Sequence, residues 1–211
     1  MNHGQAWGWV ALFFLGAYHG INPGMGWLFA VALGMQRQSG RAVWQSLLPI
    51  AAGHALAIGL VVTGAAMMGA VLPVKYVRTL VACVLFSFGL YRLLRRGHPR
   101  WGGMQVGFRD LTIWSFLMAS AHGAGFMLLP VVMGTLAGHN HMHANEFVSY
   151  GPWTGALAVA VHTLGYLLTT GAVAFVVYEK LGLNLLRKVW INLDVVWAVA
   201  LMVTAVAAVV F

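Results

Sequence analysis

Residues 42 to 74 read AVWQSLLPIAAGHALAIGLVVTGAAMMGAVLPV, without a single lysine, arginine, aspartate or glutamate. About 20 apolar residues cross the hydrocarbon core of a bilayer as an α-helix, so this stretch predicts a membrane-spanning helix. The whole chain of 211 residues has the same character, with 61% hydrophobic and 8% charged residues and a mean hydropathy of +0.82. Soluble domains usually carry about 25% charged residues. The composition therefore excludes soluble, disordered and disulfide-rich secreted proteins and indicates an integral membrane protein.

Outward from this stretch, the apolar runs predict an all-α polytopic membrane protein. Six transmembrane helices are expected, at residues 6–34, 46–72, 79–94, 111–137, 153–178 and 189–211. No linker or change in composition separates two parts of the chain. We therefore expect residues 1–211 to form a single transmembrane domain.

Positive charge is distributed unevenly between the predicted loops. Ten of the twelve lysines and arginines lie in the loops after the first, third and fifth spans, on one side of the membrane. Only Lys75 and Arg78 lie on the opposite side. Because cytoplasmic loops carry the excess of lysine and arginine, both termini are expected on the outer, periplasmic side of a bacterial inner membrane. Topology accounts for the net charge of +8, so no nucleic-acid partner is expected. The lipid bilayer is the expected surrounding, and a homo-oligomer is left open.

A weak internal repeat relates residues 1–96 to residues 97–211. Similar segments occur in the first and fourth spans and in the second and fifth spans: FFLGAYHG at 13–20 with FLMASAHG at 116–123, and GHAL at 53–56 with VHTL at 161–164. Three spans in each half make the two halves enter the membrane from opposite sides. The chain is therefore predicted to contain two inverted three-helix repeats, as in many transporters.

The first and fourth spans are expected to be broken. The first contains Asn22, Pro23 and Gly24, and the fourth contains Gly123 and Gly125. Proline removes a backbone donor and clashes with the preceding turn, and irregular backbone at membrane depth is tolerated where it is buried in protein or lines a cavity. We expect these residues to line a site; a simple proline kink packed against small residues is the alternative.

One histidine lies inside each of the first, second, fourth and fifth spans: His19, His54, His122 and His162. At about 1.5 Å per residue, all four can form one layer near the membrane midplane. Ionisable residues at that depth are rare and usually functional. Imidazole is a common ligand for zinc, nickel, copper and iron, and no acidic residue lies in the first five spans. The four histidines therefore predict a transition-metal site; hydrogen bonding between helices is the alternative.

A second histidine cluster falls in the outward loop after the fourth span, where residues 138–146 read GHNHMHANE. His139, His141, Met142 and His143 are interpreted as an accessory external metal loop. Methionine beside imidazole suits copper as well as nickel, cobalt or zinc. The loop would collect ions at the mouth of a pathway; an ordinary polar loop is the alternative.

The pattern resembles the lysine-exporter superfamily, which includes NicO-type nickel/cobalt exporters and the thiol transporters of cytochrome c maturation. The likeness lies in six spans, in two inverted halves, with Gly/Pro-broken first and fourth spans. Nickel/cobalt permeases carry a first-half histidine followed a few residues later by Asp-His; His19 corresponds to the first histidine, but residues 20–24 read GINPG and contain no Asp-His. The thiol transporters need a cysteine pair, whereas Cys83 is the only cysteine. The resemblance implies the architecture and a transport function.

Three functions suit histidines at this depth. The leading one is a permease for a transition-metal ion (nickel, cobalt, zinc or copper), whose two halves rock about the midplane site. The second is a membrane protein that holds haem b as a cofactor between paired histidines. The third is an intramembrane metalloenzyme with three histidines on zinc or iron, for which no buried carboxylate is available as a base.

Overall fold

The computed structural model describes residues 3–71, 74–94, 107–135 and 151–181, together with residues 199, 202–203 and 205–206. Its elements are α1 (His3–Ile21), the 3₁₀ turn η1 (Pro23–Met25), α2 (Trp27–Gln36), α3 (Gly40–Val71), α4 (Val74–Leu94), α5 (Phe108–Ala121), α6 (Ala124–Thr135), α8 (Gly151–Val176) and the π-helical turn η2 (Val177–Leu181). No β-strand occurs among the described residues, which confirms the all-α prediction for this part of the chain.

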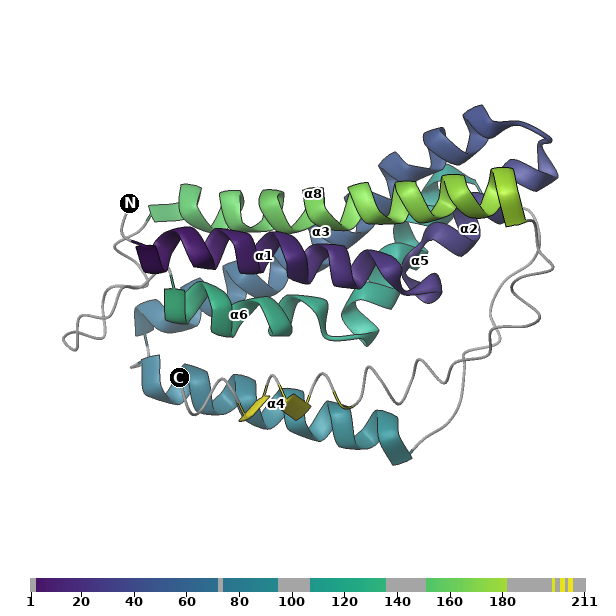
Figure 1. The fold of residues 1–211 in the computed structure, drawn as a ribbon. Coiled ribbons are helices and arrows are strands. Elements are labelled where there is room, and N and C mark those ends of the chain that lie inside the picture. The colour runs from purple at the N-terminus through teal and green to yellow at the C-terminus, as the bar shows by residue number, and fades with distance from the viewer. Residues whose placement is uncertain are drawn as a thin grey trace.

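The helices coincide with five of the six predicted spans and extend some of them. α3 begins at Gly40 rather than at residue 46, and α4 begins at Val74 rather than at residue 79. Of the predicted span 189–211, the structure describes only five residues. Figure 1 shows α1 and α8 side by side, with α4 along one edge of the bundle.

Two helical segments are long and apolar enough to cross a membrane: Gly40–Met68 in α3, and Trp153–Lys180 along α8 and η2. α5 and the first part of α6 pass the same test as a pair, although they are bent by 59° at the break between them. α1 and α2 contain shorter apolar helices. The helices are therefore those of a membrane protein with two, or up to three, candidate spans in its described part.

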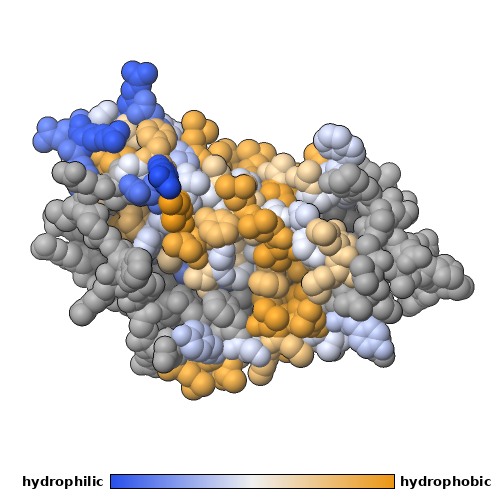
Figure 2. Space-filling view, turned by 180° about the vertical axis from the view of Figure 1, so that it is seen from behind, coloured by the Kyte–Doolittle hydropathy of each residue, from blue (hydrophilic) through white to orange (hydrophobic). Residues whose placement is uncertain are grey.

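The surface has the polarity that a membrane requires. Large apolar side chains such as Phe14, Leu60 and Leu168 are more than half exposed, and Figure 2 shows hydrophobic residues across the middle of one face and hydrophilic residues toward one end. A Cβ atom on Gly40, at the start of α3, would lie 3.9 Å from the carboxylate of Glu179. The α2–α3 turn and the end of α8 therefore share one end of the bundle.

Glycine brings α1 and α8 into backbone contact. A Cβ atom on Gly16 would overlap the carbonyl oxygen of His162, and one on Gly20 would lie 2.6 Å from the carbonyl oxygen of Tyr166. Because later residues of α1 meet later residues of α8, the two helices run parallel (Figure 1). Small residues allow such close approach between membrane helices.

A second pair is built in the same way, by α3 against α5 and α6. A Cβ atom on Gly53 would overlap the carbonyl oxygen of Thr112, and one on Gly125 would lie 2.7 Å from Cβ of Val61. The order of these contacts shows that α3 runs parallel to α5 and α6. Gly125, which the sequence placed in a helix break, lies in the first turn of α6 and packs on α3.

Both predicted breaks are present. The first lies between α1 and α2, where the side chain of Asn22 accepts a hydrogen bond from the backbone N–H of Gly24 at 2.9 Å, and Pro23 begins η1. Gly26 then adopts φ 149°, a conformation that side chains disfavour. The second lies between α5 and α6, where His122 and Gly123, at φ 68°, make the turn.

Candidate functional site

All four predicted histidines lie in the interior. His19 stands near the end of α1, His54 in α3 and His162 in α8, and each is 0% exposed. His122 is the C-cap of α5 and is 4% exposed. Burial of four imidazoles is unusual, because polar side chains lose hydration there unless partners replace it.

Three of these side chains meet one another from three different helices. The ring centroids of His19 and His162 are 5.1 Å apart, those of His54 and His162 5.5 Å, and those of His19 and His54 5.9 Å. We call these three residues the histidine cluster. His122 lies close enough to His19 for the two rings to interact electrostatically.

Backbone carbonyls set the tautomer of the two histidines beside the breaks. Nδ1 of His19 lies 2.7 Å from the carbonyl oxygen of Leu15, and Nδ1 of His122 lies 2.8 Å from that of Met118. A carbonyl oxygen only accepts, so Nδ1 must carry the proton in both rings. Nε2 then keeps its lone pair, which is the arrangement that orients metal-binding histidines.

His54 and His162 are held differently. Their Nε2 atoms face each other at 3.4 Å, and Nδ1 of each ring is buried without a hydrogen-bond partner among the described residues. The carbonyl oxygen of Leu12 lies beside His162 but does not meet hydrogen-bond geometry. A buried polar atom left unsatisfied costs about 1–3 kcal/mol, so each such atom in a native structure calls for an explanation.

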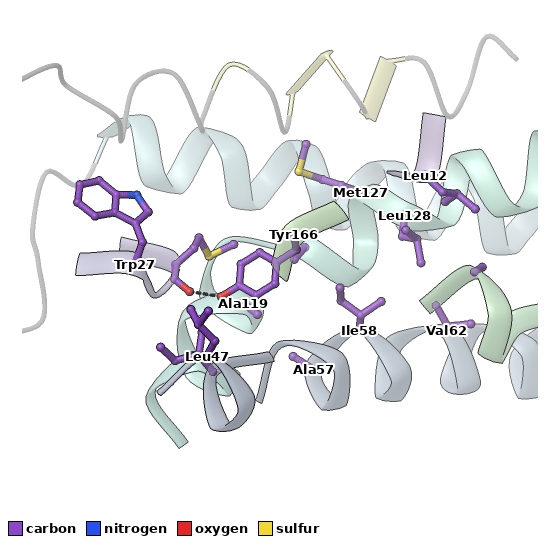
Figure 3. Packing of buried hydrophobic residues seen from close by; sticks show 14 of the residues in the cluster. Leu12, Trp27, Leu47, Ala57, Ile58, Val62, Ala119, Met127, Leu128 and Tyr166 are labelled. Carbon is purple, nitrogen blue, oxygen red and sulfur yellow. Dashed lines mark hydrogen bonds between the residues drawn. The ribbon is translucent and has the colours of Figure 1, made fainter. Parts of the chain in front are cut away.

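Tyr166 joins the histidine cluster to the first break. Its ring stacks on that of His54, with centroids 3.8 Å apart and planes 9° apart. Its hydroxyl donates a hydrogen bond to the carbonyl oxygen of Met25 in η1, the dashed line in Figure 3. Ser115 and Thr170 lie beside the same hydroxyl. His162, Tyr166 and Thr170 follow one another at intervals of four residues and therefore share one face of α8.

The donor atoms are not arranged as a finished metal site. Within the described ranges, no group of three or more histidine, cysteine, aspartate or glutamate side chains is placed to hold a metal ion. The described acidic residues, Asp110 at the start of α5 and Glu179 near the end of α8, are both exposed. An ion at the histidine cluster would therefore meet neutral donors, and the rings would have to turn toward it.

Other predicted site residues fall in different places. Asn22, Pro23 and Gly24 lie at the first break, and Gly123 lies at the second. The accessory loop with His139, His141, Met142 and His143 lies outside the described residues.

The chain matches no protein-family model, no curated protein and no solved structure. The resemblance to the lysine-exporter superfamily therefore stays an expectation. Function is inferred from the histidine cluster and the helices that carry it.

Proposed function

We propose that this protein is a transition-metal permease of a bacterial inner membrane and that the histidine cluster binds the transported ion. The observation that carries the proposal is the convergence of three fully buried imidazoles from α1, α3 and α8. Ionisable side chains inside a membrane mark ion and proton pathways far more often than they serve packing.

The spacing of the rings suits one ion. A metal ion bound to imidazole nitrogen at about 2.0–2.1 Å lies about 3.2 Å from the ring centre, so three such rings stand about 5–5.5 Å apart. The ring centroids of the histidine cluster are 5.1–5.9 Å apart. Binding then needs rotation of side chains and no large movement of helices.

Few hydrogen bonds fix the orientation of two of these rings. Nδ1 of His54 and Nδ1 of His162 have no hydrogen bond to break among the described residues, and their Nε2 atoms share only the 3.4 Å contact. His19 is anchored through the contact of its Nδ1 with the Leu15 carbonyl. One anchored and two adjustable imidazoles can open and close a site, as release of a transported ion requires.

The arrangement of helices supports transport by alternating access. In an inverted repeat, the first span is equivalent to the fourth and the second to the fifth. The two glycine-packed parallel pairs, α1 with α8 and α3 with α5 and α6, are the pairs that such a repeat exchanges. Each pair joins one helix of each half, so the pairs can rock as units about the histidines between them.

The proposed topology has six spans with both termini outside. The α2–α3 turn, with Arg37 and Arg41, lies at the same end of the bundle as Lys180 after α8. Shared placement of the first and fifth loops is what six alternating spans require, and their positive charge favours the cytoplasmic side. A reporter active only in the cytoplasm should work when fused between α4 and α5 and fail when fused between α6 and α8.

The geometry favours a metal ion over haem. Backbone contact between α1 and α8 at Gly16 leaves no space there for a porphyrin. The Nε2 atoms of His54 and His162 are 3.4 Å apart, whereas two axial imidazoles on one iron place their nitrogens about 4 Å apart. A hydrolytic metalloenzyme would also need a base, and the described core contributes no carboxylate.

Metal binding to the purified protein in lipid nanodiscs tests the proposal. His54→Ala and His162→Ala should each weaken binding at least tenfold, because each removes one of three ligands. Ser46→Ala is the matched control, since this buried hydroxyl donates to the Val43 carbonyl one turn back in its own helix. Binding should also weaken on acidification, because protons and metal ions compete for imidazole nitrogen. Equal metal binding by the wild type and both histidine variants, or a Soret band in the wild type, would overturn the proposal.

A further inference from the structure

We infer that the histidine cluster selects a soft monovalent cation, Cu(I), over divalent zinc, nickel and cobalt. This inference rests on the proposed function and names the substrate class of the same site. Three observations carry it: the charge of the donor set, the apolar surroundings, and the thioether side chains at the first helix break.

In the described part of the chain, every group that contacts the cluster is neutral when it acts as a donor. The imidazoles of His19, His54 and His162 bind metal only in their neutral form. The Tyr166 hydroxyl donates to the Met25 carbonyl, so its oxygen stays protonated. In the described part of the chain, Asp110 and Glu179 are the only carboxylates, and both are exposed at helix ends. The full charge of a bound ion is therefore left without compensation from these groups.

The apolar surroundings raise the free energy of a buried charge. Leu12, Ile58 and Leu128 are each 0% exposed and belong to the apolar core that encloses Tyr166 (Figure 3). The desolvation free energy of an ion moved from water into such a medium rises with the square of its charge. It is therefore about four times larger for a dication than for a monocation. A neutral, buried donor set consequently discriminates against divalent ions.

The number and kind of ligands point the same way. Zinc sites in proteins are almost always completed to four ligands, whereas Cu(I) is satisfied by two or three. Soft thioether donors favour Cu(I) further. Two of them lie at the first break, which follows the helix that carries His19: Met25 is 1% exposed, and Cε of Met118 lies 3.3 Å from the Cβ position of Gly24. These methionines can receive a soft ion as it enters or leaves the histidines.

Competition between ions tests the inference. Wild-type protein in nanodiscs is titrated anaerobically with chelator-buffered Cu(I), with Ag(I) as a stand-in of fixed valence, and with Zn(II), Ni(II) and Co(II). We expect Cu(I) and Ag(I) to bind at least 100-fold more tightly than each divalent ion. His54→Ala should weaken Cu(I) binding at least tenfold, and His54→Gln replaces it if the alanine variant does not stay monodisperse.

The methionines supply a second measurement. Met25→Leu with Met118→Leu should slow Cu(I) and Ag(I) uptake into proteoliposomes severalfold, whereas Met127→Leu, a buried methionine of α6, should not. Histidine-dependent binding that is tighter for any divalent ion than for Cu(I) overturns this inference and leaves the permease in place. Absence of histidine-dependent binding of every ion overturns both.

Discussion

Each of the two helix breaks lies beside a buried histidine, but the breaks are built differently. At the first, α8 braces the chain: the Tyr166 hydroxyl holds the Met25 carbonyl, and Nε1–H of Trp27 donates to the Ile21 carbonyl at 2.8 Å across the gap. At the second, the backbone turns within two residues, and N–H of Gly123 donates to the Ser120 carbonyl at 3.1 Å.

This difference makes the first break a rigid frame and the second break a hinge. The first break spans five residues between α1 and α2 and is tied to the helix that carries His162. The second bends α5 against α6 by 59° at a single left-handed glycine. Hinges absorb motion through large changes in the backbone dihedrals of a few residues, which are often small. We therefore expect the first break to fix the histidine cluster and the second to permit movement around it.

The largest loss of stability should follow Gly26→Ala, which perturbs the first break. Gly26 has φ 149°, and an added Cβ would lie 2.5 Å from Cγ2 of Ile50 and 3.0 Å from the Tyr166 hydroxyl. Strain and overpacking together should cost about 3 kcal/mol, which lowers Tm by on the order of 10 °C. Thermal unfolding followed by gel filtration in detergent measures this. A Tm within 2 °C or so of the wild type would show that the first break is not a fixed frame.

An intermediate effect should follow Tyr166→Phe. The substitution keeps the stack on His54 but removes the hydrogen bond to the Met25 carbonyl, which leaves a buried acceptor unsatisfied. The expected loss of stability is about 1–3 kcal/mol. Metal affinity should fall less than in His54→Ala, because no ligand is removed. Titration and thermal unfolding of the same sample check both, and a loss of affinity as large as that of His54→Ala would make the tyrosine itself a ligand.

The smallest loss of stability should follow Gly123→Ala, which perturbs the second break. An alanine tolerates φ near 68° at a cost of about 1 kcal/mol. Because the turn then resists other conformations, transport rate in proteoliposomes should fall severalfold while metal affinity stays within about twofold. Unchanged transport with the expected small fall in Tm would assign the second break a structural role only.

Sequence patterns predicted the helical class and both helix breaks, because hydrophobic runs and helix breakers act locally. The run at 42–74 indicated the helix found at Gly40–Val71, and Pro23 with its flanking glycines indicated the first break. All four histidines that the sequence singled out inside the predicted spans are buried.

The contacts between helices did not follow from the sequence. Which glycine meets which backbone depends on helix rotation and crossing, so nothing local marked Gly16 or Gly53 as the points of closest approach. The stack of Tyr166 on His54 joins residues of two helices more than 100 positions apart. Ser115 lies between Thr112 and Ser120 in α5, and nothing in the sequence singled it out as the hydroxyl that donates to the Ile50 carbonyl.

The parallel contact of α1 with α8 also sets the order of biogenesis. α8 begins 130 residues after α1 ends. A ribosome that adds about 5–20 residues per second needs on the order of ten seconds to supply that partner. During this interval the contact surface at Gly16 and the imidazole of His19 lack α8, the helix that covers them in the finished protein. Assembly of the histidine cluster is therefore a late step of membrane insertion, and a truncated chain that stops before α8 should be recognised and degraded as an orphan segment.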